Sequence, residues 1–195
     1  MVFPVVLNSP IAAASDDVGT AKLRPMNLRT TPLIALLLGF ALAGTVAATP
    51  GEVPVGGTVR EAPMQGLTGK SQLLSDFRGK PLIINIWASY CPPCLAEMGS
   101  LERLHRKYGK QFNVIGITID DYPDRARGFL DKAKTTFPHF IDQQLILENM
   151  LGGDRIPLTL LIDPNGRIVN KIYGAQEWDG PKAVQSIHEA FKLKK

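Results

Sequence analysis

The chain has 195 residues, a length that suits one domain of ordinary size with a proper hydrophobic core. Hydrophobic residues make up 45% and charged residues 21%, which is the balance of a globular protein rather than a disordered one. The net charge of +4 is mild, and Lys and Arg are scattered, the clearest basic run being Lys192, Lys194 and Lys195. Because nucleic-acid binding needs a clustered basic face, we expect no nucleic-acid partner.

The N-terminal quarter resembles an export signal. Residues 32–48 form an uncharged, apolar run that follows basic residues and ends with Val46 and Ala48, small residues that suit a cleavage site. At about 17 residues the run is short for a membrane span, yet an uncleaved leader that serves as a membrane anchor stays open. A buried helix of a soluble protein is the alternative, which the flanking charges disfavour.

The leader sets the expected domain boundaries. A typical signal would begin at Met26, so we expect Met26 to be the true start. We assign residues 1–48 to the leader, residues 49–57 to a Pro/Gly-rich linker and residues 58–195 to the folded domain.

The first half of the domain begins with short elements. The residues GLTGK at 66–70 indicate a hairpin, and residues 74–80 indicate a turn with one exposed helical twist. The run PLIINIW at 81–87 is typical of a strand buried on both faces. A helix is expected next, because apolar residues recur at helical spacing: Leu95, Met98, Leu101, Leu104 and Tyr108.

The second half continues the alternation of strands and helices. Residues 112–119 predict a second buried strand, and residues 124–134 and 144–151 predict helices. Two antiparallel strands at 157–163 and 167–173 are expected to flank a turn. A last helix is predicted with Asp179 as its N-cap, burying Ala183, Val184, Ile187, Ala190 and Phe191. A βαβ core followed by a hairpin and a helix predicts an α/β sandwich with a mixed sheet.

The chain contains two cysteines, Cys91 and Cys94, separated by two prolines. A purely structural bridge over so short a loop would contribute only about 2 kcal/mol, against about 4.7 kcal/mol for a 100-residue loop. A zinc site needs about four ligands, and the three histidines do not stand at ligand spacing. The remaining interpretation, redox chemistry, is favoured.

The position of the pair explains how it would react. Cys91 falls at the N-terminus of the expected helix, where the dipole and free NH groups favour a thiolate. Cys94, one turn further on, is suited to resolve the mixed disulfide. Pro92 and Pro93 fit the first helical turn but remove two possible donors to the Cys91 sulfur, which favours a reducing couple.

These residues resemble a known family. The segment WASYCPPC at 87–94, the strand IINIW before it and IPLTLLID at 156–163 are similar to the exported TlpA/ResA-type thiol-disulfide oxidoreductases, which include cytochrome c maturation reductases. The similarity covers roughly residues 57–193. It implies a thioredoxin-like sandwich, a central mixed sheet flanked by helices, with an N-terminal β-hairpin extension and a helical insertion at 124–138.

The resemblance also implies roles for particular residues. Cys91 would be the nucleophile and Cys94 the resolving thiol. Pro157 would be a cis-proline that holds the partner's backbone, with Ile156 lending main-chain hydrogen bonds; an ordinary trans proline is the alternative. Glu97 would tune the thiols and accept a proton, although a solvated helix glutamate is equally compatible with the pattern.

Four further residues also have expected roles. Trp87 and Tyr90 are expected to cover the disulfide and contact the substrate, with simple core packing as the alternative, and Trp178 is assigned to packing. Asn85 occupies the position where cytosolic thioredoxins keep a buried Asp, which moves the proton role toward Glu97.

The sequence therefore predicts an exported disulfide reductase in the periplasm or on the extracytoplasmic face of the membrane. Its expected substrates are disulfide-containing exported proteins, cytochrome c maturation is a candidate role, and a membrane thiol carrier would supply electrons. No cofactor and no metal are expected, since the sulfurs hold the electrons. The alternatives are a copper chaperone of the same fold, for which His139 is remote in sequence, and a disulfide-forming oxidant; a peroxiredoxin is disfavoured because its lone activated cysteine is missing.

Overall fold

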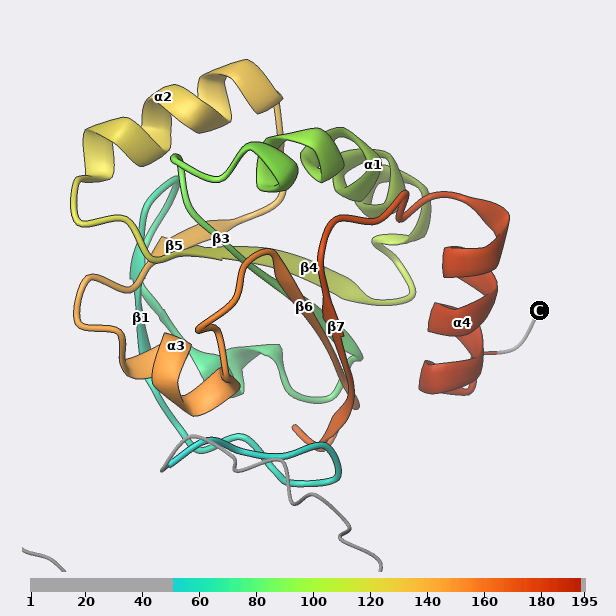
Figure 1. Ribbon diagram of the computed structural model, residues 1–195. Helices are drawn as coiled ribbons and strands as arrows, with labels where there is room; N and C mark the ends of the chain where they lie inside the picture. Colours follow the sequence, from blue (N-terminus) through green and yellow to red (C-terminus); the bar gives the residue numbers. More distant parts are fainter. Residues whose placement is uncertain (1–50, 194–195) are drawn as a thin grey trace, which may run out of the picture. The chain divides into compact units, whose positions relative to one another are not determined.

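The computed structural model describes residues 51–193, which form one mixed sheet covered by helices (Figure 1). Seven strands lie in the order β2-β1-β5-β4-β3-β6-β7. The neighbours β3, β4 and β5 are parallel, whereas β6 and β1 flank them antiparallel. The elements are β1 (Pro63–Gly66), β2 (Gln72–Leu73), η1 (Leu74–Phe77), β3 (Leu82–Trp87), α1 (Pro92–Tyr108), β4 (Asn113–Thr118), α2 (Pro123–Ala133), β5 (His139–Ile141), α3 (Ile146–Leu151), β6 (Leu158–Ile162), β7 (Ile168–Tyr173) and α4 (Pro181–Phe191).

The central strands of the sheet are buried on both faces, which confirms the expected α/β sandwich. Alternate residues of a strand point to opposite faces, so Ile83 and Trp87 of β3 join the apolar cluster made with α1, α2 and α4. Ile84 and Ile86 join the second cluster, to which α3 and the N-terminal segment contribute. Because both faces are covered, all six residues of β3 are buried.

The predicted helices and strands are present close to their expected positions. β1 and β2 pair antiparallel, as the hairpin at 66–70 required. The third helix begins at Ile146 rather than at 144, because Leu145 has a left-handed backbone and the Asp142 carboxylate accepts hydrogen bonds from the Ile146 and Glu148 amides. β5 was not predicted, since three residues carry too little periodicity to reveal a strand.

Two local expectations are wrong. Asp179 does not cap the last helix: α4 begins at Pro181 with Gly180 at the N-cap, and the Asp179 carboxylate accepts a 2.6 Å hydrogen bond from Arg103. The helical twist expected to be exposed is η1, whose Leu74 is buried in the second apolar cluster.

The segment assigned to a linker packs against the domain. The Val53 amide donates to the Met150 carbonyl (2.8 Å), and the Val53 side chain is buried. Glu52 forms an ion pair with Lys171 of β7. Residues 51–57 therefore contribute to the folded domain rather than serve as a free connection.

The proposed leader, residues 1–48, lies outside the described residues. Within residues 51–193, none of the helices combines the length and the hydropathy that a membrane span requires.

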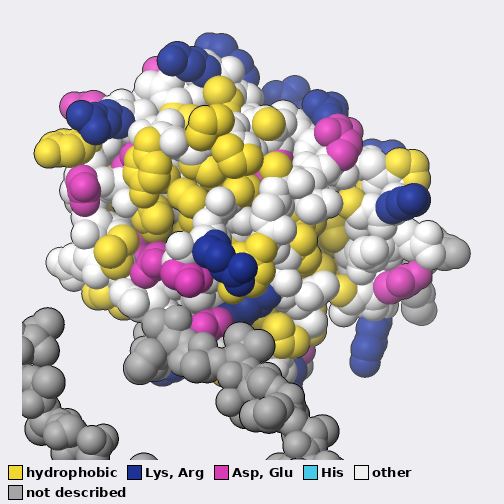
Figure 2. Space-filling model, in the orientation of Figure 1, with side chains coloured by type: hydrophobic (Ala, Val, Ile, Leu, Met, Phe, Trp, Pro, Cys, Tyr) yellow, Lys and Arg dark blue, Asp and Glu magenta, His cyan; other side chains and the backbone are white. Residues whose placement is uncertain are grey.

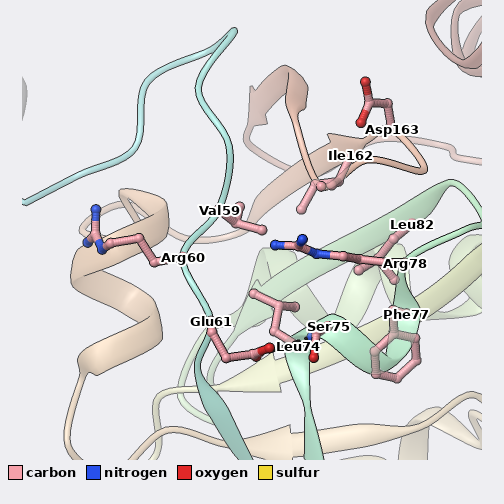
Figure 3. Close-up of a pocket in the computed structure, with 11 residues that line it drawn as sticks. Val59, Arg60, Glu61, Leu74, Ser75, Phe77, Arg78, Leu82, Ile162 and Asp163 are labelled. Atoms are coloured by element: carbon pink, nitrogen blue, oxygen red, sulfur yellow. Dashed lines mark hydrogen bonds between the residues drawn. The ribbon is translucent and has the colours of Figure 1, made fainter.

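A small hollow lies at the amino end of β3, near Leu82 (Figure 3). Arg78 extends its guanidinium across it toward Val59, and Glu61 lies at its margin, where the Glu61 carboxylate accepts a hydrogen bond from the Ser75 amide. The hollow encloses about 10 Å³, room for about one water molecule. It lies at the opposite end of β3 from the cysteines.

Candidate active site

The two cysteines form a disulfide at the start of α1. β3 ends at Trp87, and after a short loop Cys91 occupies the N-cap position of the helix, with Pro92 as its first residue. The sulfurs are 2.03 Å apart, and the Cys94 amide donates a 3.2 Å hydrogen bond to the Cys91 sulfur. This confirms the expected place of the pair at a helix N-terminus.

The two sulfurs differ in accessibility. Cys91 is 6% exposed and Cys94 has no exposed surface. An incoming thiol or disulfide can therefore reach only Cys91, and Cys94 can react only with a group already attached there.

The end of β4 holds the loop that carries Cys91. Asp120 is buried, and its carboxylate accepts hydrogen bonds from the Ser89 amide (2.8 Å), the Ser89 hydroxyl (2.6 Å) and the Thr118 hydroxyl (2.5 Å). Because β3 and β4 are parallel, their carboxyl ends meet at one edge of the sheet, which brings Asp120 beside the loop. The sequence showed Asp120 only as a strand exit.

A cis-proline lies at the same edge. The Ile156–Pro157 peptide bond is cis, as the family resemblance implied. β6 runs antiparallel to β3 with Leu158 opposite Ile86, so Pro157 lies at the end of β3 from which the cysteine loop departs. Pro157 is buried and Ile156 is half-buried.

Glu97 is buried one turn after Cys94, so the alternative of a solvated glutamate is wrong. The side chain is 1% exposed, and its carboxylate accepts hydrogen bonds from the Asn85 amide group (2.8 Å), the Trp178 indole (2.8 Å) and the Gln176 backbone amide (3.1 Å). Burial raises the pKa of Glu97 above its ordinary value, while these three hydrogen bonds oppose the rise.

Two partners of Glu97 came from distant parts of the sequence. Asn85 stands on β3 and also donates to the Thr159 hydroxyl of β6 (3.0 Å). Trp178, assigned to packing from the sequence, is buried and directs its indole NH at Glu97. A single tryptophan in an irregular segment carries no pattern that would have revealed this contact.

Trp87 and Tyr90 have different environments. Trp87 has no exposed surface and stacks on Phe129 with ring centroids 4.6 Å apart, so its expected substrate contact is replaced by a core position. Tyr90 is 68% exposed in the loop before Cys91, where it is available to another molecule.

His139 is the histidine that the alternative of a copper chaperone would need. His139 is buried on β5, its ring packs against Trp87 and Phe137, and its Nε2 lies 2.9 Å from the Thr135 hydroxyl. Among residues 51–193, no three or more His, Cys, Asp or Glu side chains gather in a group that could hold a metal ion.

A reachable sulfur at a helix N-terminus, a buried partner sulfur and a cis-proline at the same sheet edge define a thioredoxin-fold thiol–disulfide oxidoreductase. The Redoxin family model matches residues 54–188, and the chain belongs to this family. The resemblance inferred from the CPPC motif is thereby confirmed.

Curated relatives carry the same activity in their names. The thiol-disulfide oxidoreductase ResA of Geobacillus thermodenitrificans is 31% identical over 150 residues, covering 75% of this chain and 86% of the relative. ResA of Halalkalibacterium halodurans is 29% identical over 145 residues, with 74% and 82% covered. This protein is accordingly a thiol-disulfide oxidoreductase of the ResA type.

Solved structures agree with the fold. A putative thiol:disulfide interchange protein DsbE from Chlorobium tepidum aligns with a TM-score of 0.65 at 26% identity, over 71% of this chain and 99% of that chain. A DsbF homologue from Corynebacterium diphtheriae aligns with a TM-score of 0.59 at 28% identity, over 67% and 86%.

Proposed function

We propose that the protein is an exported disulfide reductase that acts on the disulfides of other exported proteins. The observation that carries the proposal is that Cys91 is the reachable sulfur of a disulfide at the sheet edge where Pro157 also lies. A backbone that pairs with the chain before Pro157 would place its own disulfide next to Cys91.

The reaction proceeds in two exchanges. The Cys91 thiolate attacks one sulfur of the substrate disulfide, forming a mixed disulfide and releasing the other substrate sulfur as a thiolate, which takes up a proton. The Cys94 thiolate then attacks the Cys91 sulfur, the second substrate thiol leaves, and the Cys91–Cys94 disulfide seen here is formed. The substrate gains two electrons and two protons, and the protein loses them.

Glu97 is the proposed acceptor of the Cys94 proton. Cys94 has no contact with solvent, so its thiol needs an internal base before it can attack. Glu97 lies one helical turn away on the same face of α1, and its raised pKa brings it closer to that of a thiol.

Exposed apolar side chains near the carboxyl ends of the parallel strands suit a protein substrate. Large exposed hydrophobic residues follow the carboxyl ends of the parallel strands: Tyr90 and Leu95 after β3, Tyr122 after β4, and Leu145 and Ile146 after β5. Figure 2 shows hydrophobic side chains gathered over the start of α1 and the amino end of β6. A partly unfolded protein would bury its own apolar residues on this surface.

The direction of the reaction is argued from the first turn of α1. Pro92 and Pro93 have no amide hydrogen, so the Cys94 amide is the first in the helix that donates to the Cys91 sulfur. A thiolate with fewer donors is stabilised less, which makes the couple more reducing. This favours reduction over disulfide formation.

The leader and the chemistry together suggest the cellular setting. A segment with signal-like features at residues 32–48 favours a position outside the cytoplasm, cleaved or anchored. After each cycle the disulfide must be reduced again, which we assign to a membrane thiol carrier. Apocytochrome c in cytochrome c maturation is one candidate substrate.

The substitution Cys94→Ala tests the proposal. It should leave Cys91 able to attack but unable to be released, so mixed disulfides with substrate proteins should accumulate and be recovered after alkylation and non-reducing electrophoresis. Cys91→Ala is the matched control and should trap nothing. Failure of Cys94→Ala to yield any thiol-reversible adduct, while wild-type protein also fails to reduce insulin, would contradict the function.

A further inference from the structure

The irregular segment between β7 and α4 lies along α1. Within it, residues 176–179 contact three α1 residues spaced by three, which therefore lie on one helical face: Glu97, Ser100 and Arg103. The segment is thus attached to the helix that carries both cysteines.

The outer attachments hold the segment in place. The Ser100 hydroxyl donates to the Gln176 carbonyl (3.2 Å) and accepts from the Trp178 amide (3.0 Å). At the surface, Arg103 pairs with Glu177 (2.5 Å) and Asp179 (2.6 Å). Trp178 is therefore fixed on both sides along the chain.

The inner attachments end on one carboxylate oxygen. Glu97 Oε2 accepts both the Trp178 indole NH and the Gln176 amide, while Oε1 accepts only from Asn85. Two of the three donors to a buried acid thus come from this segment. A donor directed at a carboxylate stabilises the ionised form over the protonated form.

We propose that Trp178 is a positioning residue that keeps Glu97 able to accept a proton from Cys94, and that the Ser100 and Arg103 contacts hold Trp178 in that position. The inference rests on the proposed function of Glu97. Without the indole NH, Glu97 would stay protonated to a higher pH and could not take the Cys94 proton in the pH range where the wild type works.

No unpaired charged group among the described neighbours of Glu97 competes with the Trp178 indole in setting its protonation. On α1 the neighbouring titratable groups are Cys91 and Cys94, which carry no charge in the disulfide form. The segment contributes Glu177 and Asp179, both paired with Arg103 at the surface. β3 and β6 contribute the neutral Asn85 and Thr159.

The test is Trp178→Phe, which keeps an aromatic ring and removes the NH. The Glu97 carboxyl is followed by carbon NMR across pH in the oxidised protein and assigned by comparison with Glu97→Gln. Its titration midpoint should rise by about one pH unit, the expected size for the loss of one charge-assisted hydrogen bond. The rate of mixed-disulfide resolution should shift to higher pH by the same amount, a loss of about tenfold below the new midpoint.

Controls separate this role from packing. Trp87→Phe removes an indole that is also buried but whose NH has no hydrogen-bond partner, and should leave the Glu97 midpoint unchanged. In a Glu97→Gln background, Trp178→Phe should not move the pH profile. If Trp178→Phe does not fold, Ser100→Ala should raise the midpoint in the same direction by a smaller amount.

An unchanged Glu97 midpoint in the folded variant overturns the proposal, as does an equal profile shift in the Glu97→Gln background. The NMR titration needs no substrate. If the wild type is inactive but Trp178→Phe still shifts the Glu97 midpoint, the proposed function is refuted and the Trp178–Glu97 coupling is retained.

Discussion

Burial shifts the pKa values of two side chains, Glu97 and His139, in opposite directions, because it disfavours the charged form of each. Burial raises the pKa of Glu97, because the deprotonated carboxylate is the charged form. Burial lowers the pKa of His139 to about 3, opposed only by the charge of Glu102. The Glu97 carboxylate has three donors, whereas His139 Nδ1 has no hydrogen-bond partner. The first arrangement suits proton transfer and the second keeps a neutral ring in the core.

The His139 environment predicts an acid-sensitive stability. The unfolded ring takes up a proton below about pH 6.5 but the folded ring does not until about pH 3, so stability is complete above pH 6.5 and falls as the pH decreases. Relative to His139→Phe, the wild type should lose about 1.4 kcal/mol per pH unit over that range. Urea unfolding at several pH values measures the difference in free energy of unfolding between the two proteins. Glu97 affects this free energy in the opposite direction, but equally in both proteins, so its contribution cancels. Parallel curves for the two proteins would disprove the assignment.

Among the elements, the parallel strands β3 and β4 build the active site together. β3 delivers the cysteine loop and β4 delivers Asp120, which accepts three hydrogen bonds from Ser89 and Thr118. The His139 ring of the neighbouring strand β5 lies against Gly116 of β4, where an added Cβ would lie 2.2 Å from His139 Nδ1. The loop geometry thus depends on pairing between strands that are distant in sequence.

Asp120→Ala should therefore loosen the loop. Loss of three hydrogen bonds to a buried carboxylate should lower the free energy of unfolding by roughly 2–4 kcal/mol and slow the attack by Cys91. Asp121→Ala is the matched control, since Asp121 is exposed and contributes only its carbonyl to a hydrogen bond from Gln143. Chemical denaturation and insulin reduction give the two readouts. Equal effects of the two substitutions would refute the role of Asp120.

At the scale of the whole molecule, the direction of the reaction depends on which redox form the fold favours. The proposal of a reductase predicts a potential for Cys91 and Cys94 near the thioredoxin end, about −270 to −200 mV. Equilibration of the protein in defined thiol buffers, followed by a count of free thiols, measures it. A value near about −120 mV would indicate a disulfide-forming oxidant instead.

The sequence alone determined the fold class, the order of most elements and the redox pair. Buried strands, amphipathic helices and a CxxC motif at a helix start are local patterns, because each follows from residues within one element. Even the pairing of β1 with β2 could be read from the residues between them. The prediction of Asp179 as an N-cap was wrong, because a residue type that caps helices well can instead form an ion pair with a distant arginine.

Only the tertiary structure decided the surroundings of the cysteines. Whether Glu97 is solvated or buried, whether Trp87 meets a substrate or the core, and which residues face Glu97 depend on contacts across 12 to 81 positions of sequence. Such contacts leave no periodic pattern, because each joins single side chains of different elements or of an irregular segment. The roles of Trp178 and Asp120 therefore became visible only in the folded chain, where Trp178 contacts α1 and Asp120 contacts the loop after β3.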